Sequence, residues 1–219
     1  LPATWSANVI GEIPGTERAN EIVLLGAHLD SWDLGQGAID DGAGVAIVTE
    51  AARLVGRLER KPARTVRVVL FANEEFGLSG ANEYARLVGD EAARHVLAVE
   101  ADLGGGAVWR VQSLVAPEAV PAVDAIREAL KPLALEAGGN DAHGGSDLGP
   151  LRALGVPILD LSQDATRYFD VHHTVNDTLA QIDGKTLNQV VAAYAVTAYL
   201  AASKNGDFGR LAPEEKEQR

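Results

Sequence analysis

Three apolar runs in this chain each end in acidic side chains, and this pattern limits the folds that the chain can adopt. The runs are EIVLLGAHLD at 21–30, RTVRVVLFANEE at 64–75 and HVLAVEAD at 95–102. Short continuous apolar runs are typical of strands that are buried on both faces, as in a parallel sheet covered by helices. In such sheets functional groups gather at the carboxyl ends of the strands, and the acids of all three runs lie there.

Segments with helical spacing alternate with the predicted strands. We expect further strands at 4–13, 109–114 and 156–162, and helices at 42–60, 79–89, 116–133, 146–155 and 183–203. This alternation predicts an α/β fold, a single domain with a mostly parallel central sheet and helices on both faces. We expect residues 1–205 to form the domain, with Ser146 capping its short helix, and residues 206–219 to be a polar tail that frays.

Composition narrows the range of partners and of metal ligands. The chain has 219 residues and a formal net charge of −12. Nucleic acids and anionic membranes would be repelled, so neither is an expected partner. No apolar run approaches the roughly 18–20 residues of a membrane span, and no signal peptide is visible. Because the chain contains no cysteine, a metal would have to bind through His, Asp or Glu.

The first acidic strand end places His28 and Asp30 on the same side of the chain, because residues two apart in a strand point the same way. The Asp30 carboxylate could accept a hydrogen bond from the imidazole and so orient His28 toward a metal. A simple hydrogen-bonded pair without a metal is the alternative. This pair alone leaves both interpretations open.

Asp40 and Asp41 follow a glycine-rich loop and precede a predicted helix. One of them can cap that helix, which leaves the other free to bind a metal, and a carboxylate can bridge two cations. A strand, a glycine-rich loop and a helix can also bind a dinucleotide. Here, however, Asp40 occupies the place of the third glycine and would repel phosphate, which argues against a dinucleotide-dependent oxidoreductase.

Glu74 and Glu75 end the second acidic run and have apolar residues on both sides. Adjacent side chains diverge at a strand end, so one can bind a metal while the other acts as general base on the water that the metal activates. Glu100 and Asp102 close the third run, again two residues apart and therefore on one side.

Four further histidines lie outside these strand ends. His172 and His173 are adjacent in a loop, where a histidine can point back toward the strand ends while Asp177 or Thr178 caps the segment that follows. His95 and His143 are isolated, and we interpret both as packing or surface residues.

Together the motifs resemble those of the M28 family of zinc metallopeptidases, and most closely its carboxypeptidase Q-type branch. The matching segments, in family order, are GAHLDSWDLGQGAIDDGAG, FANEEFGLSG, VEADLGG, GGSDLGPLRALGVP and YFDVHHTVNDT. The resemblance implies a zinc-exopeptidase fold and a metallo-exopeptidase that cleaves small peptide substrates near a free terminus. It also implies a secreted or periplasmic location and leaves a homodimer open.

The resemblance assigns the metal ligands residue by residue. His28 and Asp102 would bind one Zn²⁺, Glu75 and His173 would bind a second, and Asp40 would bridge the two ions. Mn²⁺ or Co²⁺ is the alternative to zinc. The choice of His173 over His172 follows from its place directly before the threonine of HTVNDT.

Further roles follow from the same resemblance. Glu74 would be the general base, Asp30 would hold His28, and a cis peptide bond would follow Asp40. Relatives of this branch carry a long upstream segment. We therefore expect this chain to be either the catalytic core of a longer protein or a domain that has lost elements covering one sheet edge and part of the substrate cleft. A non-catalytic metal-binding or interaction domain is the alternative, but such a domain should have lost Glu74 or a ligand. Aminopeptidase and dipeptidase or carboxypeptidase activity both stay open, because the loop of Asp147 could contact either substrate terminus.

Overall fold

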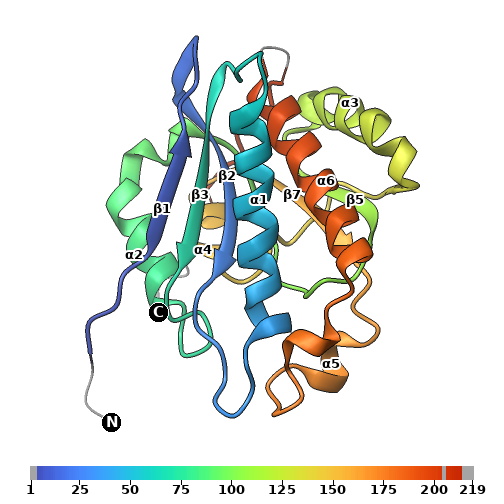
Figure 1. Cartoon of the computed structure of the whole chain (residues 1–219). Helices are drawn as coiled ribbons and strands as arrows, with labels where there is room; N and C mark the ends of the chain where they lie inside the picture. The colour runs from blue at the N-terminus through green and yellow to red at the C-terminus, as the bar shows by residue number, and fades with distance from the viewer. Residues whose placement is uncertain (1–3, 204–205, 214–219) are drawn as a thin grey trace.

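The computed structural model describes residues 4–203 and 206–213, and its centre is a seven-stranded sheet with the order β1-β3-β2-β4-β7-β5-β6 (Figure 1). Strands β3, β2, β4 and β7 run parallel, whereas β1 is antiparallel to β3 and β5 is antiparallel to β7. The predicted parallel sheet is therefore confirmed at the centre. The strands are β1 Val9–Ile13, β2 Arg18–His28, β3 Arg64–Phe71, β4 His95–Glu100, β5 Val108–Leu114, β6 Glu136–Ala137 and β7 Ile158–Gln163.

Helices cover both faces of the sheet, as expected. α1, α3 and α6 pack on one face, and α2 and α4 pack on the other (Figure 1). Within the described part of the chain, none of the helices is both long and apolar enough to cross a membrane. Their bounds are α1 Ala43–Arg57, α2 Ser79–Val88, α3 Val120–Leu130, α4 Gly149–Ala153, α5 Tyr168–Val171 and α6 Gly184–Ala202. Short 3-10 segments lie at Gly89–Arg94, Pro117–Ala119, Lys131–Leu133 and Leu179–Gln181. The segment Ala38–Gly42 is a kinked turn in which Asp40 and Asp41 have non-helical backbone angles.

The apolar run of β2 is continuous because both faces of this strand are buried. Leu24 and Leu25 point to opposite faces and are both fully buried. Leu25 packs in the cluster that contains α1 and α6, and Leu24 packs in the cluster under α2. Parallel pairing then brings the strand ends together, with His28 beside Phe71 of β3 and Gly26 beside Glu100 of β4. The loops that follow these three strands therefore start side by side.

The start of α4 differs from the prediction that Ser146 caps it. Leu148 occupies the N-cap position, and no side chain caps the helix. The carboxylate of Glu100 instead accepts hydrogen bonds from the backbone N–H groups of Asp147 at 3.3 Å and Leu148 at 3.1 Å. These amides have a buried acceptor from a neighbouring strand, so a local cap at Ser146 is not needed.

Residues 206–213 pack against the domain, contrary to the expected fraying. Phe208 is 1% exposed and belongs to the larger core cluster. The backbone N–H of Leu211 donates to the carbonyl of Gly155 at 3.1 Å. A single aromatic side chain thus anchors a segment whose composition is otherwise polar, and the rest of the predicted tail, 214–219, lies outside the described residues.

Candidate metal centre

A first cluster of ligand-type groups forms where β2 and β4 end. His28 is the last residue of β2 and is 1% exposed, and Asp40 lies in the following loop and is 4% exposed. The Nε2 atom of His28 is 3.1 Å from Oδ1 of Asp40 and 3.3 Å from Oδ1 of Asp102. One imidazole and two carboxylates therefore converge at this point.

A second cluster lies on the other side of the same aspartate. The Nε2 atom of His173 is 3.1 Å from Oδ2 of Asp40 and 2.9 Å from Oε2 of Glu75. The His173 side chain is 38% exposed, so this cluster opens to solvent. The structure thus brings all five expected ligands together, and Asp40 presents one carboxylate oxygen to each cluster.

The orientation of His28 has a different cause from the one expected. Its Nδ1 donates a hydrogen bond to the backbone carbonyl of Asp30 at 2.9 Å, whereas the Asp30 carboxylate lies 3.8 Å away. That carboxylate accepts hydrogen bonds from the backbone N–H groups of Glu74 at 2.9 Å and Glu75 at 3.2 Å. Asp30 therefore holds the imidazole through its carbonyl and the glutamate loop through its side chain, and Nε2 of His28 is left facing Asp40.

The peptide bond between Asp40 and Asp41 is cis, as the resemblance implies. The Asp41 carboxylate accepts hydrogen bonds from the backbone N–H groups of His28 and of Gly44, both at 3.0 Å. The contact with Gly44 caps the start of α1. Asp41 is thus the acid that serves the helix, and Asp40 is the one left to face the two clusters.

Asp177 holds the loop that carries Asp40. Its carboxylate is buried and accepts hydrogen bonds from the backbone N–H groups of Ile39 at 2.6 Å and Asp40 at 3.1 Å. The expectation that Asp177 or Thr178 caps the next segment is wrong. Thr178 occupies the N-cap position of the turn at Leu179–Gln181 without a side-chain hydrogen bond, and the backbone N–H of Leu179 donates to Oε1 of Gln36 at 3.0 Å. The partners of Asp177 are more than 130 residues away in sequence, so no local pattern could have identified this role.

Glu100 and Asp102 separate, although they are two residues apart. Asp102 joins the first cluster, whereas Glu100 is buried beneath the loop of Asp147. Asp147 is 1% exposed, and neither of its carboxylate oxygens has a hydrogen-bond partner within the described residues. Burial raises the pKa of Asp147 to about 8. Because the Asp147 side chain has so little exposed surface, it is not open to contact with a substrate terminus, the role that the sequence left open for its loop.

Negative charge dominates the two clusters. Burial raises the pKa of Asp102, and the nearby Asp40 carboxylate raises it further. Burial and the Asp40 charge likewise raise the pKa of Glu75, and burial raises that of Glu74. For His28, burial lowers the pKa, but contacts with Asp102 and Asp40 outweigh this effect and raise it to about 12. The gathered carboxylates therefore favour the binding of a cation at this site.

The donor set fits divalent metal ions. Oε1 of Glu75 and Oδ1 of Asp102 are buried without a hydrogen-bond partner in the described part of the chain, a state that is rare for buried polar atoms. Ligand atoms of His28, Asp40 and Glu75 lie within 4.8 Å of one another. Those of His28, Asp41 and Asp102 do so too, but Asp41 already accepts two backbone hydrogen bonds. Imidazole and carboxylate groups without thiolates suit a catalytic zinc site.

Glu74 and Glu75 diverge, as their adjacent positions predict. The Glu75 carboxylate turns to His173, whereas the Glu74 side chain is half-buried and contacts Ser146. The charges of the first cluster also affect the pKa of Glu74, and the Asp102 carboxylate raises it. Glu75 thus belongs to the second cluster, whereas Glu74 contacts Ser146 and lies close enough to the clusters for their charges to affect its pKa.

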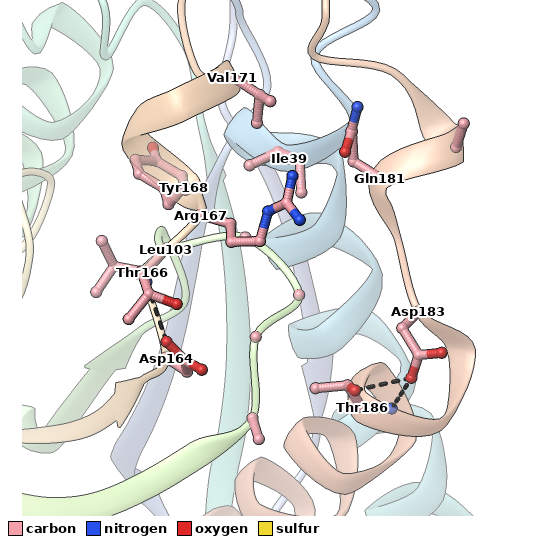
Figure 2. Close-up of a pocket in the computed structure, with 15 residues that line it drawn as sticks. Ile39, Leu103, Asp164, Thr166, Arg167, Tyr168, Val171, Gln181, Asp183 and Thr186 are labelled. Carbon is pink, nitrogen blue, oxygen red and sulfur yellow. Dashed lines mark hydrogen bonds between the residues drawn. The ribbon is translucent and has the colours of Figure 1, made fainter.

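A pocket of about 430 Å³ opens beside the clusters (Figure 2). Ile39 and Tyr168 line it; Ile39 precedes Asp40 in the chain, and the Tyr168 side chain hydrogen-bonds to Asp40. Burial and the neighbouring carboxylates raise the pKa of Tyr168. Arg167 also lines this pocket and forms no ion pair with any residue that the structure describes. The pocket therefore offers room and an unpaired positive charge next to the candidate site.

Two aromatic side chains beside the clusters were missed at the level of sequence. The indole Nε1 of Trp32 donates to Oε2 of Glu75 at 2.8 Å, and Tyr168 contacts Asp40. The position of Trp32 two residues after Asp30 was the only available signal. A lone aromatic residue near a motif is more often a packing residue, so that signal was too weak to use.

Comparison with known proteins gives a consistent family assignment. Residues 8–198 match Peptidase family M28. Carboxypeptidase Q of Rattus norvegicus is 39% identical over 201 residues, which cover 92% of this chain and 42% of that protein. The crystal structure of a Peptidase M28 precursor from Shewanella amazonensis SB2B has a TM-score of 0.90 and 49% identity, over 94% of this chain and 47% of that chain. An aminopeptidase from Aneurinibacillus sp. strain AM-1 has a TM-score of 0.70 and 26% identity, over 95% and 50% of the two chains.

The chain spans 42% of the length of that curated relative and 47–50% of the two solved chains. The family match includes both clusters, the loop of Glu74 and the sheet that positions them. The resemblance inferred from the motifs is confirmed: this chain belongs to Peptidase family M28.

Proposed function

We propose that this domain is a metallo-exopeptidase that uses two zinc ions to hydrolyse peptide bonds of di- or oligopeptides near a free terminus. The observation that carries the proposal is Asp40, whose two carboxylate oxygens face two separate groups of imidazole and carboxylate ligands. Membership of a peptidase family supports hydrolysis of peptides. The donor set supports zinc, with Mn²⁺ or Co²⁺ as alternatives, and the family resemblance supports a secreted or periplasmic location.

His28 and Asp102 would hold one ion, Glu75 and His173 would hold the other, and Asp40 would contact both. When bound, such a pair of ions lowers the pKa of water and polarises the scissile carbonyl. The carboxylate oxygens Oδ1 of Asp102 and Oε1 of Glu75, which have no hydrogen-bond partner within the described residues, would then have a positively charged partner.

Glu74 acts as the general base in this proposal. It takes a proton from the attacking water and passes it to the leaving amine, as a carboxylate within hydrogen-bond reach of the reacting atoms can do. Its place is set by Asp30, whose carboxylate holds the backbone N–H groups of both Glu74 and Glu75. A single aspartate thus couples the position of the base to that of a metal ligand.

The open side of the site lies at His173, and Tyr168, which contacts Asp40, also lines the pocket of Arg167. A short peptide could place its scissile bond at the clusters and one residue in this pocket. Matched dipeptides with a free amine, a blocked amine or a blocked carboxylate identify the terminus that the site requires.

The substitution Glu74→Gln tests the mechanism, because it keeps size and polarity but removes the base. We expect two zinc ions per chain by elemental analysis and a turnover about 10²–10⁴-fold lower than in the wild type. Glu118→Gln, which changes an exposed glutamate in the turn Pro117–Ala119, is the matched control and should hydrolyse peptides at the wild-type rate.

Three results would contradict the proposal in different ways. Wild-type turnover in Glu74→Gln would remove Glu74 from the mechanism. Zinc binding by the wild type without hydrolysis of any of the dipeptides would instead favour a non-catalytic metal-binding domain. A wild-type protein that binds fewer than two ions would eliminate the paired site.

A further inference from the structure

Trp32 contacts both side chains that would hold the second ion. Its indole Nε1 donates a hydrogen bond to Oε2 of Glu75 at 2.8 Å. Its ring stacks on the imidazole of His173, with 4.8 Å between ring centroids and 25° between ring planes. Trp32 lies in the loop after β2 and is 43% exposed, so it is not part of either face of the core.

The hydrogen bond fixes how Glu75 presents its carboxylate. Oε2 accepts from Trp32, while Oε1 is buried and has no hydrogen-bond partner within the described residues. The indole is a donor without an acceptor atom, so it can orient the carboxylate but cannot compete with it as a ligand. Donors of this kind around a metal ligand set its direction and its affinity for the metal.

The stacking contact supports an imidazole that has little other packing. His173 has a backbone φ of 58°, in the left-handed region that few residues other than glycine adopt, and its side chain is 38% exposed. Its ring contacts both Trp32 and the ring of His172, whose centroid lies 4.4 Å away. His172 in turn stacks on Tyr168. Trp32, whose ring also lies 5.5 Å from that of Phe76 between centroids, is therefore one member of a row of rings that holds His173.

We propose that Trp32 is a positioning residue that sets the affinity of the Glu75–His173 site for its metal ion without binding the ion. This inference rests on the proposed two-ion site. Packing alone would need only an aromatic ring, and phenylalanine would supply it. The hydrogen bond to Glu75 needs the indole N–H, so the two roles can be separated by substitution.

The test compares Trp32→Phe and Trp32→Ala with the wild type in a stepwise zinc titration of the metal-free chain. Trp32→Phe keeps a ring against His173 but lacks the donor to Glu75. We expect one of the two zinc-binding steps to be about 10–100-fold weaker than in the wild type and the other step to be unchanged, because loss of such a partner typically has this effect. Trp32→Ala loses both contacts and should weaken the same step further.

Trp109→Phe is the matched control. Trp109 is 42% exposed, close to the exposure of Trp32, but it lies in β5 and packs on Arg110. Its substitution should leave both zinc affinities unchanged. Peptidase activity of Trp32→Phe should be low at limiting zinc and return toward the wild-type level at saturating zinc.

The outcomes separate this inference from the function on which it rests. A wild type that binds fewer than two zinc ions overturns both. If the wild type binds two zinc ions and Trp32→Phe binds both with the wild-type affinities, only the positioning role is overturned. A lower melting temperature of metal-free Trp32→Phe with unchanged zinc affinities would also overturn it, since that result describes a packing residue.

Discussion

Aspartates around the site hold backbone amides, whereas the carboxylate of Asp40 contacts the side chains of the two clusters. Asp30 binds the amides of the glutamate loop, Asp41 binds those of His28 and Gly44, and Asp177 binds those before the cis peptide. A carboxylate that accepts two backbone N–H groups keeps a fixed direction. The geometry of the clusters thus depends on acids that do not belong to them.

Asp177→Ala should destabilise the fold and distort the loop of Asp40. The substitution removes the acceptor for two buried amides, each of which costs about 1–3 kcal/mol when left unpaired. We expect the free energy of unfolding in urea to fall by about 2–4 kcal/mol. Asp164→Ala is the control, since Asp164 accepts only from the exposed turn at Thr166 and should cost less than about 1 kcal/mol. Equal losses in the two variants would contradict the assigned role.

At the scale of elements, the junction of α1 with the end of β4 brings the loops of the site together. Gly44, in the first turn of α1, packs against the carbonyl of Ala101 and the carboxylate of Asp41. A methyl group at Gly44 would overlap both atoms. The close approach of helix and strand, which places Asp40 near Asp102, therefore requires glycine at this position.

Gly44→Ala tests this junction, because helix propensity and packing predict opposite signs. Alanine is better than glycine within a helix by up to about 1 kcal/mol, whereas overpacking costs about 1–3 kcal/mol. We expect a net loss of unfolding free energy and weaker zinc binding. Gly184→Ala at the start of α6 has open space around it and should be neutral or stabilising. A gain of stability in Gly44→Ala would contradict the close packing.

The strands around the site were predicted correctly, because their apolar sequence pattern directly reflects which residues are buried. β2, β3 and β4 lie in the expected segments, and their carboxyl ends are adjacent in the sheet. Their apolar runs report burial directly, since each strand is covered on both faces. Caps were predicted poorly. Ser146 and Thr178 have the right chemistry, but acceptors from distant segments serve the nearby amides, and sequence spacing carries no information about them.

At the scale of the whole molecule, a polar network ties β3, α2 and β4 together on the face opposite α1. Arg67 donates to the hydroxyl of Tyr84 at 2.8 Å, and this hydroxyl lies 2.7 Å from Nε2 of His95. A neutral imidazole with its proton on Nδ1 can accept a hydrogen bond from this hydroxyl at Nε2. His95 is 2% exposed, as a packing residue should be.

This network predicts a pH-dependent stability. Burial, with the nearby Arg67 charge, lowers the pKa of His95 from 6.5 to about 4. The unfolded chain takes up this proton near pH 6.5 and the folded chain only near pH 4, so stability is complete above pH 6.5 and falls between these values. The full loss is about 3 kcal/mol, from 1.36 kcal/mol for each pKa unit.

Urea unfolding of the wild type and of His95→Gln at pH 7.5 and pH 4.5 measures this effect. The variant lacks the titrating group, so its stability should fall less between the two pH values, by about 2–3 kcal/mol. His143→Gln, at an exposed position, is the control and should follow the wild type. Parallel pH profiles for the wild type and His95→Gln would contradict the assignment.

The sequence by itself determined the class of fold and the edge of the sheet where acids and histidines meet, because apolar periodicity and parallel strand order are local or nearly local properties. It also identified the chemical types in the clusters. The tertiary structure decided which atom of each residue meets which partner. Asp30 contacts His28 through its carbonyl, and Trp32 reaches Glu75 across two loops. Hydrogen bonds depend on tenths of an ångström between distant segments, and only the packed chain sets those distances.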